Sequence, residues 1–185
     1  MNTEVLSYPK VSQWAALSRW VLLLGAAVAI TNLGLPQPIT GPLVNALLIL
    51  TVEWGSVSQA ICLGMVTPVG AAIRGILPLP LMVMIPFISL GNALLVGSYG
   101  LLRSHNRWLG LLVGASVKAL FLYLTSMILV ARPLHIEMGG RDQAVILSES
   151  FLKMMSWPQW VTALAGGLLA FGVLRIQQKG LRSKV

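Results

Sequence analysis

The chain has 185 residues, of which 56% are hydrophobic and 10% are charged, and its mean hydropathy is +0.82. This composition excludes an ordinary soluble domain, and the length fits about six membrane spans of roughly 20 residues in one domain, residues 1–185. The net charge of +8 does not indicate a nucleic-acid partner, because the basic residues cluster at the ends of apolar runs. The single cysteine, Cys62, excludes an intrachain disulfide and a cysteine-built metal site.

The first ten residues, MNTEVLSYPK, lack the basic segment, apolar run and small-residue cleavage site of a signal peptide, so the first apolar run is expected to be a true span. Apolar runs of helical length alternate with polar or proline-rich connectors along the rest of the chain. The predicted spans are residues 17–33, 43–54, 57–72, 81–102, 108–131 and 159–176. We therefore predict an all-α membrane protein with six transmembrane helices.

One stretch, residues 67–86 (TPVGAAIRGILPLPLMVMIP), interrupts the apolar pattern with four prolines, two glycines and Arg74. Proline removes a backbone donor and blocks helix continuation, so this stretch cannot form one plain spanning helix. Irregular backbone at membrane depth is tolerated where it is buried in protein or lines a polar cavity. The stretch is therefore predicted to wall a ligand cavity.

A longer polar loop, residues 132–158, precedes the last span. Its middle, QAVILSESFLKMM (residues 143–155), has apolar residues at roughly helical spacing, which predicts a short helix on the protein surface. The chain shows no internal repeat, and this disfavours an inverted-repeat secondary transporter.

The basic residues also predict the orientation. The N-terminus, the 103–107 turn and the C-terminal tail hold eight of them, against four on the opposite side, so both termini are expected in the cytoplasm. The proline-bearing or long segments 34–42, 73–80 and 132–158 then all face outward. An elaborated outer surface indicates a site that is loaded from outside.

Lys118 lies about ten residues into the fifth predicted span, near the centre of the bilayer. A charge there costs several kcal/mol unless it is paired or faces a wet cavity. No carboxylate lies deep in a span to pair with it. Two interpretations stay open: a cation that contacts a ligand, or a structural ammonium bonded to carbonyls or to the amides of Asn45 or Asn92.

Further residues are candidates for the substrate site, each with an alternative role. Arg74 can pair with an anionic ligand or reach the interface, Met84 can line an apolar pocket or fill the core, and Trp157 can contact a ligand or anchor a span. The full set of candidates is Gln37, Thr40, Asn45, Arg74, Met84, Asn92, Lys118 and Trp157.

Two small residues in the first span, Gly25 and Ala29, share one helix face and permit close helix approach. They indicate either a docking face for a partner or ordinary packing. Cys62 is interpreted as a small core residue, with a soft ligand to a metal-containing cofactor as the alternative. No Ser/His/Asp set, HExxH motif, paired carboxylates or glycine-rich phosphate loop is present, so we expect no enzyme, no catalytic residue and no metal site.

Several stretches of the chain together resemble the substrate-binding (S) components of energy-coupling factor (ECF) vitamin transporters, in particular a subgroup often labelled iron hydrogenase. The similarity covers most of the chain from the first span onward. The stretches that carry it are PQPITGPLVNALLIL (36–50), GMVTPVGAAIRGILPLPLMVMIPFISLGNALLV (64–96), VKALFLYL (117–124) and SWPQWVTALAGGLLA (156–170).

The resemblance implies a six-helix fold with cytoplasmic termini, in the cytoplasmic (inner) membrane of a bacterium. It also implies a vitamin-sized ligand under the outer loops, and docking onto a transmembrane coupling subunit that carries two ATPases. Those partners would use ATP, and the chain itself would hold no cofactor. Family members usually carry Ala-x-x-x-Ala in the first span, where this chain has Gly25-x-x-x-Ala29.

The expected function is thus a membrane-embedded binding subunit for uptake of a vitamin or cofactor precursor. The alternative is a structural or scaffolding membrane protein of similar fold with no small-molecule ligand. The sequence leaves the ligand open: Lys118 and Arg74 favour a carboxylate or phosphate, whereas the methionine-rich, weakly charged composition favours cobalamin or another tetrapyrrole.

Overall fold

The computed structural model describes residues 13–73, 82–131, 134–138, 141–145 and 148–182. The described chain is mostly helical, and each of the six predicted apolar runs overlaps a helix. The helices are α1 (Gln13–Asn32), α2 (Gln37–Trp54), α3 (Val57–Ile73), α5 (Ile85–Leu102), α6 (Arg107–Val130), α7 (Glu149–Met154) and α8 (Trp157–Arg182).

Four helical segments of the described chain are long and apolar enough to cross a membrane: α1, α5, α6 and the stretch Glu149–Gly180, which includes α7 and most of α8. The apolar part of α3, Val57–Gly70, is shorter. Such helices are compatible with a multi-pass membrane protein. They expose many large apolar side chains, as a surface that faces lipid would.

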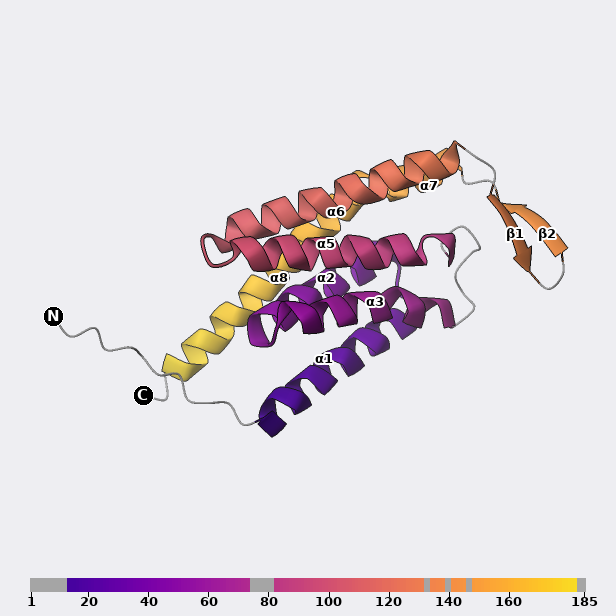
Figure 1. Cartoon of the computed structure of the whole chain (residues 1–185). Coiled ribbons are helices and arrows are strands. Elements are labelled where there is room, and N and C mark those ends of the chain that lie inside the picture. Colours follow the sequence, from indigo (N-terminus) through magenta and orange to yellow (C-terminus); the bar gives the residue numbers. More distant parts are fainter. Residues whose placement is uncertain (1–12, 74–81, 132–133, 139–140, 146–147, 183–185) are drawn as a thin grey trace.

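The helices pack as a bundle in which α5 lies along α6 and α2 lies against α8 (Figure 1). Glycines allow these close approaches: a Cβ at Gly114 of α6 would lie 2.7 Å from the backbone oxygen of Leu95 in α5. The main core is apolar and includes the fully buried side chains of Leu48, Leu63 and Leu95. In contrast, α1 lies at the edge of the bundle and buries only Leu23 and Ala27.

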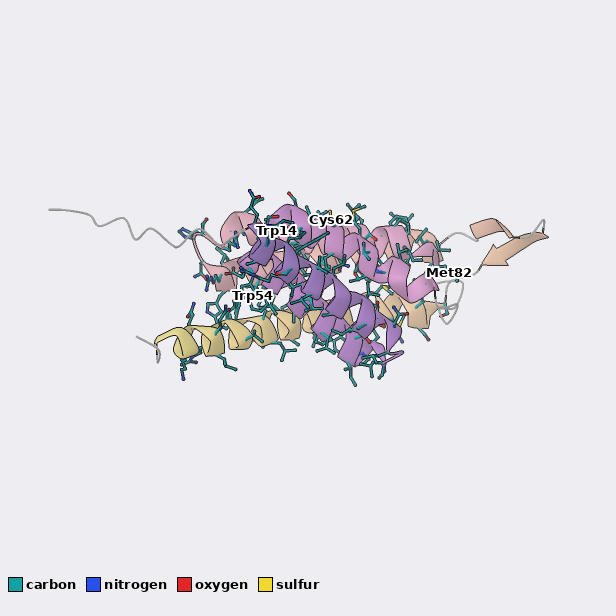
Figure 2. All side chains as sticks on the ribbon, turned by 90° about the horizontal axis from the view of Figure 1, so that it is seen from below. Trp14, Trp54, Cys62 and Met82 are labelled. Carbon is teal, nitrogen blue, oxygen red and sulfur yellow. The ribbon has the colours of Figure 1, made fainter. Side chains whose placement is uncertain are left out.

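The two ends of the bundle differ. The start of α1, the turn between α5 and α6 and the end of α8 lie at one end, which we call the terminal end (Figure 1). The strands β1 (Leu134–Met138) and β2 (Arg141–Val145) project from the other, which we call the hairpin end. Figure 2 shows Trp14 and Trp54 toward the terminal end and Met82 toward the hairpin end.

The prediction of a short surface helix within residues 143–155 is correct only for the later part of that stretch, where α7 (Glu149–Met154) lies. Residues 141–145 form β2, which pairs antiparallel with β1 in the register Leu134↔Val145. Helix α7 begins only after Ser148, whose hydroxyl accepts a hydrogen bond from the backbone N–H of Phe151, and Phe151 is buried. A short apolar run fits a strand as well as a helix, so the helical spacing of this run was not decisive.

A polar cluster ties the terminal end together. Glu53, whose side chain is 6% exposed, lies 2.9 Å from Arg107 and 3.7 Å from Arg103, and it accepts a 2.7 Å hydrogen bond from the hydroxyl of Tyr99. Arg103 also donates to the backbone oxygen of Val52. The cluster therefore fixes the end of α2 to the turn between α5 and α6.

Candidate functional site

A cavity of about 340 Å³ lies within the helix bundle, toward the hairpin end. The proline-interrupted helices α2 and α3 supply much of its wall, and α1, α5, α6 and α8 complete it. Its described lining is Thr31, Gly34, Leu35, Gln37, Thr40, Gly41, Val44, Asn45, Thr67, Pro68, Ile85, Ile88, Asn92, Lys118, Met155 and Gln159. The stretch 67–86, which was predicted to wall a cavity, contributes Thr67, Pro68 and Ile85.

Lys118 is the only charged residue among the described residues of this lining. It is 3% exposed, and its Nζ donates a 2.7 Å hydrogen bond to Asn45 Oδ1 and another of 2.7 Å to Asn92 Oδ1. The two amides come from α2 and α5, so three helices meet at one ammonium group. An ammonium group has three N–H donors, and these bonds use two of them.

The orientation of the Asn92 amide follows from the presence of Pro68 in α3. Pro68 has no backbone N–H, so the carbonyl of Gly64, four residues earlier, lacks its helical donor. Asn92 Nδ2 donates to this Gly64 oxygen at 3.0 Å, and the Thr67 hydroxyl donates to it at 3.2 Å. Because the NH₂ group of Asn92 is bonded to α3, its Oδ1 faces Lys118.

Two glycines bring the asparagines into place. A Cβ at Gly64 would lie 2.8 Å from the Cβ of Asn92, and a Cβ at Gly166 would lie 2.6 Å from the Cβ of Asn45. Neither distance is compatible with a side chain unless the helices move apart. Gly64 therefore sets the spacing of α3 and α5 at the site, and Gly166 sets that of α8 and α2.

Five of the eight residues predicted for the site line the cavity: Gln37, Thr40, Asn45, Asn92 and Lys118. Met84 does not; it is fully buried in an apolar cluster with Leu122, Phe151 and Met155, and of these four only Met155 also lines the cavity. Trp157 is 70% exposed and lies outside the lining. Arg74 lies outside the described residues.

Sequence reasoning missed Thr31 and Gln159, which reach the cavity from helices distant in the chain. No local pattern distinguishes them, because only the packing of α1 and α8 brings them there. Gly64 was also not recognised as a site residue, and Pro68 was predicted to wall a cavity only as part of the stretch 67–86. Their spacing, G-x-x-x-P within an apolar run, was a usable signal. The proline leaves the carbonyl four residues earlier without its helical donor, and a glycine at that earlier position lets a neighbouring helix approach closely.

A second, wider opening of about 850 Å³ lies between α1, α3 and α5. Its described lining is mostly apolar, and Asn32 and Ser89 are the only residues there with polar side chains. Cys62 is exposed, so its interpretation as a core residue is wrong, and it does not line the cavity around Lys118. Among the described residues, no three His, Cys, Asp or Glu side chains gather as a metal site would need.

The predicted docking residues lie on the outer side of α1. Gly25 and Ala29 are both exposed, and a Cβ at Gly25 would meet nothing within 4 Å. Within the described chain, this small-residue face therefore plays no part in the packing of the bundle.

The chain matches no protein-family model, no curated protein and no solved structure. The cavity and the contacts around Lys118 are therefore the basis for any functional conclusion.

Proposed function

We propose that this protein is a membrane-embedded substrate-binding subunit for uptake of a vitamin or cofactor precursor, without catalysis of its own. The observation that carries the proposal is the cavity around Lys118. Its volume is in the range of small-molecule sites, and its lining combines apolar side chains with a few convergent polar groups, as such sites do. A buried cation beside empty space is costly to maintain, which favours a functional role.

The remaining parts of the proposal concern membrane topology and partners. In it, α1, α2, α3, α5, α6 and α8 are the six spans, and the terminal end, where Arg19, Arg103 and Arg107 lie, faces the cytoplasm. The cavity then opens toward the outside. The exposed face of Gly25 and Ala29 would dock onto an ECF coupling subunit, whose two ATPases hydrolyse ATP.

A thermal unfolding assay of the full-length protein in lipid nanodiscs tests ligand binding. A panel of vitamins and cofactor precursors is added, and unfolding is followed by tryptophan fluorescence. A ligand at 100 times its dissociation constant should stabilise the folded state by about 2.7 kcal/mol. A panel in which no compound shifts the unfolding temperature would contradict the proposal.

Docking is tested separately by co-purification with an ECF coupling module. Gly25→Trp and Ala29→Trp should lower the amount of co-purified module and leave ligand binding unchanged. The control is Leu169→Trp, at an exposed position of α8. Equal recovery of the module with all three variants would contradict the assignment of Gly25 and Ala29 to the docking face.

The second candidate is a scaffolding membrane protein that uses the same helices but no ligand. The hydrogen bonds from Lys118 to Asn45 and Asn92 favour it, because they tie α2, α5 and α6 together without any ligand. In that case Lys118→Met should lower the stability, but variant protein that still folds should keep the cellular function. A binding subunit should instead lose uptake although the variant folds.

A further inference from the structure

We infer that the ligand of this cavity is a compact monoanion, whose single carboxylate binds Lys118 and Asn45 and whose remaining atoms are largely apolar. This inference rests on the proposed function and names the chemical class of its substrate. The basis is two N–H donors, one of Lys118 and one of Asn45, that make no hydrogen bond within the described residues.

Two hydrogen-bond donors converge at one point of the cavity wall. The Lys118 ammonium has one N–H beyond those given to the asparagines, and Asn45, which accepts through Oδ1, makes no hydrogen bond from its Nδ2 to another described residue. Both residues line the cavity, and Lys118 Nζ lies 2.7 Å from Asn45 Oδ1. A carboxylate has two acceptor oxygens, so it can accept from both donors at once.

The charge of the site favours a monoanion. No described residue of the lining carries a negative charge, and Lys118 carries the only positive one. A buried charge is stabilised when an opposite charge pairs with it, and one ammonium balances one carboxylate. A phosphate dianion would bring a second negative charge that the described lining does not balance.

The size and lining of the cavity restrict the remainder of the ligand. A cavity of about 340 Å³ lies at the lower end of the roughly 300–1,000 Å³ range of small-molecule sites. This size suits a vitamin-sized acid better than a corrinoid or another tetrapyrrole. Away from Lys118 the wall includes Leu35, Val44, Ile85, Ile88 and Met155, which suit an apolar ring or chain.

The test compares acids with neutral partners of the same shape. Full-length protein in nanodiscs is titrated with nicotinate and nicotinamide, biotin and biotinamide, lipoate and lipoamide, and pantothenate and panthenol. Pyridoxal phosphate is titrated as the phosphate-bearing comparison. At least one acid should bind about 30-fold or more tightly than its neutral partner, since leaving a buried charge unpaired costs that much or more. Lys118→Met should remove this preference, and Lys179→Met, at an exposed site on α8, should keep it.

If Lys118→Met does not fold, Asn45→Asp provides a second test of acid binding. It places a carboxylate beside Lys118 within the protein, so the variant should fold and lose acid binding. Equal binding of acids and neutral partners, unchanged acid binding by Asn45→Asp, or tighter binding of pyridoxal phosphate than of every acid would each overturn the ligand class and leave the binding function intact. Failure of every compound, charged or neutral, would overturn the proposed function as well.

Discussion

The carboxylate of Glu53 lies 2.9 Å from the guanidinium of Arg107, and the two partners differ sharply in burial. The side chain of Glu53 is 6% exposed and that of Arg107 is 49% exposed. The side chain of Arg103, the second arginine beside Glu53, is 33% exposed. Both arginines can therefore be solvated if the ion pairs are broken, whereas the glutamate cannot. This asymmetry leads to a prediction about which partner can be removed.

Arg103→Met with Arg107→Met should destabilise the protein by about 3–5 kcal/mol, because a buried carboxylate then loses its opposite charges. Glu53→Gln should cost about 1–2 kcal/mol, since the amide oxygen can still accept from Tyr99 and the arginines turn to water. Reversible unfolding in mixed detergent measures both. The triple variant, which combines Glu53→Gln with both arginine substitutions, should recover most of the stability lost in the double arginine variant. Equal losses of stability in Glu53→Gln and in the double arginine variant would contradict the asymmetry.

Gly166→Ala should destabilise the protein by about 1–3 kcal/mol, the usual cost of overpacking. The added methyl group would meet the Asn45 Cβ and the backbone oxygen of Pro42, both at 2.6 Å. Gly172→Ala, on the same helix with nothing within 4 Å, is the matched control and should stabilise by up to about 1 kcal/mol. Unfolding temperatures of the two variants should therefore move in opposite directions.

Pro68→Ala should separate stability from binding. Alanine supplies the missing N–H to the Gly64 carbonyl, which strengthens α3 but competes with Asn92 Nδ2 for that oxygen. We expect a higher unfolding temperature together with a roughly five-fold loss of ligand affinity, equivalent to about 1 kcal/mol for one hydrogen bond. The control is Pro86→Ala, at the first turn of α5, where proline costs no helical bond.

Lys118→Met should destabilise the protein by about 1–3 kcal/mol, because it leaves the amide oxygens of Asn45 and Asn92 without their donor. Adding Asn45→Leu and Asn92→Leu should restore part of this loss, since an apolar replacement of a whole buried polar network is often neutral or stabilising. A double-mutant cycle on equilibrium unfolding measures the coupling. Strict additivity of the three substitutions would show that the residues do not act as one network.

The helices were predictable because glycine, proline and charged residues delimit apolar runs in this chain. Lys118, Asn45 and Asn92 were predictable as notable residues because each is polar inside an apolar run. Their contact was one of two interpretations that the sequence left open, and the structure shows it; whether a ligand also binds Lys118 is still a prediction.

Other features depended on tertiary packing. Nothing near Gly166 in the sequence indicates that Asn45, over a hundred positions earlier, lies against it. Met84 and Trp157 were assigned by residue type, and packing placed Met84 in a core and Trp157 at the surface. The hairpin was missed because its apolar residues also fit a helix.

The contacts of Lys118 also determine when the protein can mature during synthesis. Lys118 bonds residues 73 and 26 positions earlier in the chain. Asn45 and Asn92 therefore leave the ribosome first, and in a bilayer they would wait without their cation until α6 inserts. A nascent chain that ends before residue 118 would hold the Oδ1 atoms of both asparagines without their ammonium donor.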